Sequence, residues 1–166
     1  MELEDDTKVI LISSDSKKFE TSAKAAMRSN LVKLSIDNCR EDIIEFTVNN
    51  VKGNILEKIV EYLEHYKNEE PKEIERPLPS ANFKECVGEW DFNYIDVDLG
   101  FVNELLLASN YMDIKPLYEL SSAKIASIIK GKTTEELRRT LGINNDFTPE
   151  EEQQIIEENR WCMENL

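Results

Sequence analysis

The hydrophobic pattern at the start of the chain predicts a small sheet. Residues 8–13 form a run of β-preferring residues, and the turn cluster Ser13-Ser14-Asp15-Ser16 separates it from a second short strand around Phe19. A further strand is predicted over residues 45–48. Between them, Thr21 or Ser22 is placed to cap a small helix.

The middle of the chain carries apolar residues at helical spacing. A stripe at i, i+3, i+4 and i+7 predicts a core-facing helix over about residues 53–66; it consists of Leu56, Ile59, Val60 and Leu63. One more helix is predicted from a cap at Asp98 to about Asn110, and another is opened by Pro116. Few strands and many helices indicate the α+β class.

Between residues 68 and 88 the pattern gives way to charged and turn residues. Three of the chain's five prolines, Pro71, Pro77 and Pro79, lie there. A segment of this composition cannot bury enough apolar surface to offset its ordering entropy. We predict a mobile charged loop that acts as a solvated spacer.

The last 36 residues, 131–166, contain two fully specified helix starts. Thr133 with Glu136, and Thr148 with Glu151, form capping boxes in which a hydroxyl and a carboxylate satisfy the first free amides of a helix. Pro149 fits the first helical position of the second helix. The tail is therefore predicted to be helix, break, helix.

These two predicted helices are too short and too thinly apolar to make a core of their own, because isolated helices of this length are marginal in water. Two interpretations stay open. The tail packs back on its own domain, or its apolar residues form a surface for a partner.

Composition limits the partners. Twenty basic and 34 acidic residues give a net charge of −14, which would repel nucleic-acid phosphates and anionic membranes. No apolar run is long enough for a membrane span, and residues 1–6 are acidic where a secretory signal would be basic and then apolar. We expect an intracellular protein that binds neither nucleic acid nor membrane.

Residues for catalysis or metal binding are scarce. The three cysteines, Cys39, Cys86 and Cys162, are too widely spaced for a disulfide framework or a zinc site. His65 is the single histidine, which removes most Cys–His and Ser–His–Asp arrangements, and it is expected to be structural or solvent-facing. We predict no catalytic residue, no metal and no cofactor.

The tail residues also carry a family resemblance. Three runs in the tail carry it: G-K-T-T-E-E-L-R-R-T from Gly131, then I-N-N-D-F-T-P-E-E-E, then E-N-R-W-C. Together they closely resemble the C-terminus of the Skp family, the adaptor subunits of SCF (Skp, cullin, F-box) ubiquitin ligases. Similar residues continue upstream at Trp90-Asp91, Val97-Asp98, the run 108–115 and the hairpin at 11–15. The resemblance implies a BTB/POZ domain over residues 1–115 and a C-terminal two-helix, F-box-binding extension over 116–166.

The resemblance also implies two protein partners, a cullin scaffold and F-box proteins. Asn110 and Tyr111 match cullin contacts, although without the resemblance a core position for Tyr111 would be slightly favoured. The residues that match the F-box surface, which could also be the inner face of three helices, are Ile125, Ile128, Ile129, Leu137, Leu141, Ile143, Phe147, Ile156 and Trp161. Among them Trp161 is the preferred hot spot, because aromatic anchors dominate interface energies.

Further expectations follow from the same resemblance. Pro149 matches a position that is hydroxylated and then glycosylated in some protist members. The free tail is expected to be loosely ordered, or to self-associate as a weak homodimer, until a partner covers it. The protein would work in the cytoplasm and nucleus as a non-catalytic adaptor for ubiquitin-dependent degradation.

Two alternatives remain open from the sequence. One is an elongin-C-like BTB adaptor for other receptor boxes, although that relative lacks the two-helix extension. The other is an unrelated acidic helical interaction protein. Three segments also depart from the Skp pattern. Residues 46–51 occupy the place of a usual proline-rich run, Leu141-Gly142 replaces a typical Phe-Asn, and the loop at about 76–88 differs from the usual acidic insert.

Overall fold

The computed structural model describes residues 7–36, 43–80 and 82–163. Packing divides the chain into two compact units, Met1–Lys130 and Gly131–Leu166. The functional division that we expect after residue 115 is a different boundary, because the helix that follows it packs within the first unit. That functional division stays a prediction.

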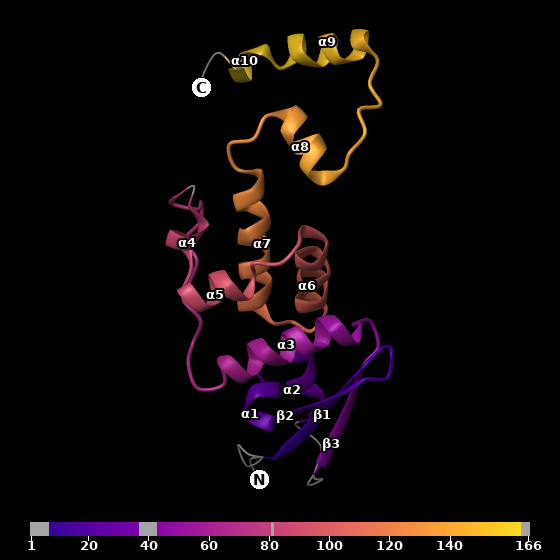
Figure 1. The fold of residues 1–166 in the computed structure, drawn as a ribbon, viewed down its shortest axis with the longest axis vertical. Helices are drawn as coiled ribbons and strands as arrows, with labels where there is room; N and C mark the ends of the chain where they lie inside the picture. The colour runs from indigo at the N-terminus through magenta and orange to yellow at the C-terminus, as the bar shows by residue number, and fades with distance from the viewer. Residues whose placement is uncertain (1–6, 37–42, 81, 164–166) are drawn as a thin grey trace. The chain divides into compact units, whose positions relative to one another are not determined.

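The first unit is built on a three-stranded sheet in the order β2-β1-β3 (Figure 1). Strands β1 (Lys8–Ser13) and β2 (Lys18–Ser22) form the predicted antiparallel hairpin. Strand β3 (Ile43–Val48) begins slightly earlier than predicted and pairs with β1 in parallel. This parallel pairing needs a crossover, which includes helices α1 (Ala23–Ala26) and α2 (Asn30–Ile36).

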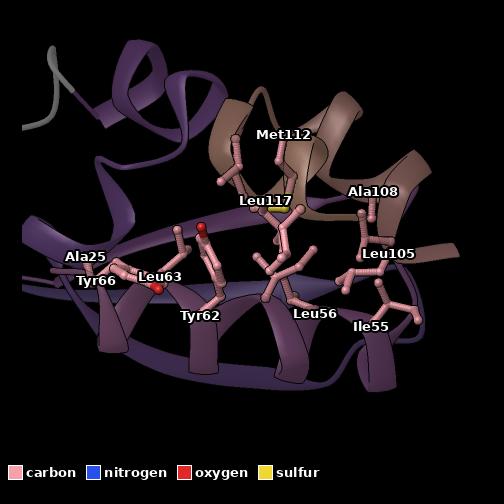
Figure 2. Packing of buried hydrophobic residues seen from close by; sticks show 14 of the residues in the cluster. Ala25, Ile55, Leu56, Tyr62, Leu63, Tyr66, Leu105, Ala108, Met112 and Leu117 are labelled. Carbon is pink, nitrogen blue, oxygen red and sulfur yellow. The ribbon is translucent and has the colours of Figure 1, made fainter. Parts of the chain in front are cut away.

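Helix α3 (Gly53–His65) is the centre of the core and matches the predicted helix closely. It contacts β1 and β2 as well as α6 (Leu99–Tyr111), which in turn packs on α7 (Lys115–Ile129). Figure 2 shows buried side chains of α3 pointing toward Leu105, Met112 and Leu117. Asp98 caps α6 as predicted, accepting a hydrogen bond from the backbone N–H of Phe101.

Both ends of α3 are fastened to the hairpin by carboxylates. At its N-terminus the Gly53 N–H donates to Asp15 Oδ1 over 2.7 Å, and the Ser13 hydroxyl lowers the pKa of Asp15 by donating to the same oxygen. Near its C-terminus Glu64 Oε1 accepts from the Thr21 hydroxyl at 2.6 Å and from the Ser22 N–H at 3.1 Å. Ser22 rather than Thr21 therefore caps α1.

Residues 68–88 are not a loop throughout, as the prediction of a solvated spacer had it. Helix α4 (Phe83–Cys86) lies in this segment, and the side chains of Phe83, Cys86 and Val87 are buried. Some of their partners are distant in sequence: the ammonium of Lys124 on α7 lies 5.6 Å from the Phe83 ring. A local pattern could not reveal such contacts, whereas the mobility of the segment stays a prediction.

Helix α5 (Glu89–Tyr94) completes the first unit with an aromatic cluster. Trp90 stacks on His65 at 3.6 Å between ring centroids and on Tyr94 at 4.9 Å. The buried Asp91 accepts a 2.7 Å hydrogen bond from the Tyr66 hydroxyl. Burial raises the pKa of Asp91, and the Tyr66 hydrogen bond only partly offsets this effect.

The second unit contains α8 (Thr134–Leu141), α9 (Pro149–Glu158) and the short α10 (Arg160–Met163). Both predicted capping boxes are present. The Thr133 and Thr148 N–H groups donate to Glu136 and Glu151 at 2.9 and 2.8 Å. Gly142 ends α8 in the left-handed conformation, with φ 66°. The predicted helix, break and helix are thus confirmed.

Candidate protein-binding surfaces

Asn110 and Tyr111 lie at the end of α6 and are both exposed. The Tyr111 side chain is 38% exposed, while the next residue, Met112, is fully buried and takes the core position. The alternative that Tyr111 is a core tyrosine is therefore wrong. Its ring and hydroxyl are available at the surface, as suits a contact residue.

Tyr111 lines a groove that we call the α6 groove. One wall comes from the β3–α3 turn and the start of α3, and the other from α6; the lining residues are Asn50, Val51, Lys52, Ile55, Glu104, Leu107, Ala108 and Tyr111. The hydrogen bond from the Ser14 N–H to the Val51 carbonyl, together with the Asp15 cap, fixes the first wall. A 2.9 Å ion pair joins Lys52 to Glu104 across the groove.

Sequence reasoning did not find Leu107, which is the most exposed apolar side chain of this groove at 62%. Its signal was available, because Leu107 lies off the buried face of α6 formed by Val102 and Leu105. A leucine on the outer face of an amphipathic helix is informative when other exposed apolar residues adjoin it. Leu107 and Tyr111 lie one helical turn apart.

The candidate F-box residues fall into two groups. Ile125, Ile128 and Ile129 lie at the end of α7 in the first unit, and their exposure increases along the helix: Ile125 packs against the core, while Ile129 is 38% exposed. Ile125 thus contributes partly to the core, as the alternative of an inner helix face anticipates. Ile129 presents its side chain to solvent.

The second group lies in the 131–166 unit. Neither α8 nor α9 has a buried residue. Leu137 is half-buried, and the others are exposed by 40 to 66%: Leu141, Ile143, Phe147, Ile156 and Trp161. Ile155, which sequence reasoning left out of the set, is exposed to a similar degree at 40%. This unit therefore carries a high density of accessible apolar side chains for its size.

Polar contacts within this unit hold its two longer helices together. Arg138 on α8 forms a 3.0 Å ion pair with Glu152 on α9, and its guanidinium lies 6.0 Å from the Phe147 ring. Hydrogen bonds from the Thr133 backbone and side chain lower the pKa of Glu136. Helices α8 and α9 thus have defined local structure although neither contributes a buried side chain to a hydrophobic core.

Comparison with known proteins shows which family this chain belongs to. Residues 7–68 match the Skp1 family tetramerisation domain, and residues 115–162 match the Skp1 family dimerisation domain. A relative from Tetrahymena thermophila, "S-phase kinase-associated protein 1 homolog", is 47% identical over 160 residues, which is 95% of each chain. The chain belongs to the Skp1 family.

Other Skp1-family relatives are similar over almost their whole lengths. "Suppressor of kinetochore protein 1" of Schizosaccharomyces pombe is 40% identical and covers 94% of this chain and 98% of its own. "E3 ubiquitin ligase complex SCF subunit sconC" of Arthroderma benhamiae is 37% identical and covers 95% and 96%. The BTB/POZ-like fold with C-terminal helices that the resemblance implied is confirmed.

Other expected features of this Skp1-family chain have defined positions. Pro149 is exposed at the first position of α9. Cys86 is buried and forms no disulfide with the described residues, whereas Cys39 and the side chain of Cys162 lie outside them. Within residues 7–36, 43–80 and 82–163 there is no cluster of metal-ligating side chains. No helix in these ranges is long and apolar enough to cross a membrane.

Proposed function

We propose that this chain is an adaptor subunit of an SCF-type ubiquitin ligase, which joins a cullin scaffold to F-box substrate receptors for ubiquitin-dependent degradation. Family membership supports the role, since a relative of similar length is named as an SCF subunit. The observation that carries the proposal is that exposed apolar side chains occur on both compact units. A two-sided adaptor needs separate surfaces of this kind.

The cullin surface is the α6 groove together with Asn110. Leu107 and Tyr111 supply exposed apolar area in its lining, and Lys52 and Glu104 supply charges that can exchange their mutual ion pair for contacts with a partner. A mixed patch of this kind, with an aromatic anchor and a polar rim, is typical of specific interfaces.

The proposed F-box contacts are of two kinds, the exposed end of α7 on the first unit and, separately, the apolar residues of the 131–166 unit. Trp161, 66% exposed, is the expected hot spot. Helices without buried residues gain stability when a partner covers them, so receptor binding and ordering of this unit are coupled. The free chain should self-associate weakly through the same residues.

The adaptor performs no chemistry of its own. Holding two partners in one complex converts the encounter of substrate and ubiquitin-carrying enzyme into an intramolecular event with a high effective concentration. Such a subunit requires neither a cofactor nor a metal. We place its work in the cytoplasm and nucleus, and we propose Pro149, exposed at a helix start, as a hydroxylation site.

The test is co-purification with an F-box segment and, separately, with a cullin N-terminal domain. Truncation after Lys130 should abolish F-box binding only, because it removes the whole second unit. Asn110→Lys with Tyr111→Lys should abolish cullin binding only, and Trp161→Ala should weaken F-box binding about tenfold or more. The control is Asn93→Lys, an exposed position on α5.

The results separate the alternatives. A folded full-length chain that captures neither partner would show that the SCF role is wrong and would favour an acidic helical protein of another kind. Capture of cullin that is insensitive to Asn110 and Tyr111 would remove the α6 groove from the proposal. F-box binding that survives the truncation would place the receptor surface elsewhere.

A further inference from the structure

Residues 74–78 form a strap that is held beside α7. Upstream of the strap, Arg28 donates hydrogen bonds to the Glu70 carboxylate and the Glu69 carbonyl at 2.8 and 2.9 Å. Within the strap, Arg76 forms a 2.6 Å ion pair with Glu119 of α7. At its end, the Lys130 ammonium donates to the Leu78 carbonyl at 2.8 Å.

Apolar contacts add to these polar ones. Ile74 and Leu78 are partly buried and pack against the core. Two apolar anchors, an ion pair to Glu119 of α7 and a hydrogen bond from Lys130, which follows α7, are more contacts than a solvated spacer requires. The strap therefore forms a wall beside α7 on the first unit.

Between the strap and α7 lies a hollow of about 360 Å³, which we call the strap groove. The strap side is Ile74–Leu78, and the α7 side is Tyr118, Glu119, Ser122, Ala123 and Ala126. Ser122 and Ala126 are small residues one turn apart, so they form a shallow floor beside the 41% exposed ring of Tyr118. The volume suits one or two side chains and excludes a whole helix.

The strap groove continues into the proposed F-box surface. Ala126, at one end of its floor, is next to Ile125 in sequence and one turn before Ile129, and both isoleucines belong to that surface. Tyr118, at the other end, lies about 16 Å from Ile129 along the helix, at 1.5 Å per residue. A receptor bound at the end of α7 can therefore extend into the groove.

The charges of the groove favour an uncharged occupant. Arg76 forms an ion pair with Glu119, and Lys115 lies 3.9 Å from the same Glu119 carboxylate. Glu75 also lines the groove, so these four residues together carry no net charge. A charged side chain that entered the groove would lose its hydration and would meet no excess of opposite charge. An aliphatic or aromatic side chain instead gains contact with Ile74, Leu78 and Tyr118.

We propose that the strap groove binds an extended segment of the F-box receptor that adjoins its F-box and places an apolar side chain on the Ser122–Ala126 floor. This inference rests on the proposed function and specifies a second receptor contact beside the F-box surface. Receptors with a suitable flanking residue are bound more tightly than their isolated F-boxes, so the groove discriminates among receptors.

The test compares the full chain with Tyr118→Ala and Ser122→Arg variants, using an F-box receptor that co-purifies with the wild-type chain and the isolated F-box of the same receptor. Both variants should weaken binding of the full receptor about tenfold, equivalent to one well-packed contact. Binding of the isolated F-box should not change. Asn103→Arg, at an exposed position on α6, is the matched control.

Each remaining result has one meaning. Unchanged affinity of both variants for the full receptor would refute the groove proposal, while loss of isolated F-box binding on truncation after Lys130 would still support the adaptor role. A change in sedimentation of the variants without a change in receptor affinity would show that a second copy of the chain occupies the groove, and would also overturn the proposal.

Discussion

Glu64 fastens α3 to the end of β2, and its replacement should destabilise the first compact unit. Its Oε1 atom accepts from the Thr21 hydroxyl at 2.6 Å and from the Ser22 N–H at 3.1 Å, and its Oε2 atom contacts the Lys67 ammonium at 3.0 Å. Thr21 is buried, so its hydroxyl has little access to water as a replacement partner. We predict losses of stability for Glu64→Gln and Glu64→Ala.

The magnitude follows from the hydrogen bonds that each substitution alters. The amide of the Glu64→Gln variant would keep an acceptor for Thr21 and Ser22. Each hydrogen bond would then contribute the smaller free energy of a neutral pair in place of that of a charged one, a total loss of about 1–2 kcal/mol. Alanine removes the acceptor and leaves the Thr21 hydroxyl unpaired. Because the Glu64 side chain is 34% exposed, water compensates in part, and we expect about 2–3 kcal/mol.

The assay is urea unfolding followed by circular dichroism. With a slope of about 1–3 kcal/mol per molar urea, the alanine variant should shift the midpoint by about 1 M. Two controls should change little: Lys67→Ala removes only a surface ion pair, and Glu57→Gln alters an exposed position of the same helix.

The pH dependence gives an independent check. Burial raises the pKa of Glu64, but the hydrogen bonds from Thr21 and Ser22 and the charge of Lys67 outweigh it and lower the pKa below its ordinary value of 4.5. A lowered folded-state pKa means that the carboxylate stabilises the fold above the unfolded value, and that this stability is lost as pH falls through the folded pKa.

The difference between wild type and Glu64→Gln should therefore shrink below about pH 4. A Glu64→Ala variant within about 0.5 kcal/mol of wild type at pH 7, a limit set by the usual scatter of surface substitutions, would refute the reasoning. A stability difference between wild type and Glu64→Gln that stays constant down to about pH 3 would show that the charge of Glu64 does not contribute to stability.

Two further substitutions test buried polar groups by the same urea assay. Tyr66→Phe removes the hydrogen-bond donor to the buried Asp91 and should lower the free energy of unfolding by about 1–3 kcal/mol. It should also raise the pKa of Asp91 further, which NMR titration measures. An unchanged free energy of unfolding would contradict this prediction. Within the described residues the buried Ser121 hydroxyl has no hydrogen-bond partner, so Ser121→Ala should be neutral or stabilising by about 1 kcal/mol. Ser109→Ala removes a 2.8 Å bond to the Leu106 carbonyl and should instead destabilise by about 1 kcal/mol; equal effects of the two serine variants would refute this contrast.

The elements that the sequence predicted well are those whose signals are local. The capping boxes at Thr133 and Thr148 bring hydroxyl and carboxylate together within one turn, so four residues suffice to place each helix start. The apolar stripe of α3 is similarly complete within one helix. Tertiary packing did not need to be known for these elements.

The features that were missed depend on distant residues. The buried Phe83 ring has the Lys124 ammonium of α7 5.6 Å from its centroid, and Ile74 and Leu78 pack against the core from within a segment whose composition is typical of a charged loop. The Lys52–Glu104 ion pair likewise joins residues from different elements. The composition of a short sequence window cannot predict such contacts, because the window contains only one of the two contacting residues.

The candidate surfaces were predicted unevenly for the same reason. The resemblance supplied Asn110 and Tyr111, and the structure adds the groove around Tyr111 with the exposed Leu107. It also shows that Ile125 is shared between core and surface, which periodicity alone does not resolve. Whether these surfaces bind their proposed partners is decided by the co-purification experiments.

The absence of buried side chains in α8 and α9 has a consequence for the lifetime of the protein. Helices without a core open at little cost in free energy, and a protease cleaves the open form. A receptor present at about 100 times its dissociation constant would lower that open population about 100-fold. Chains in excess over receptors would lose their tails first, so proteolysis would hold the number of intact adaptors close to the number of receptors available.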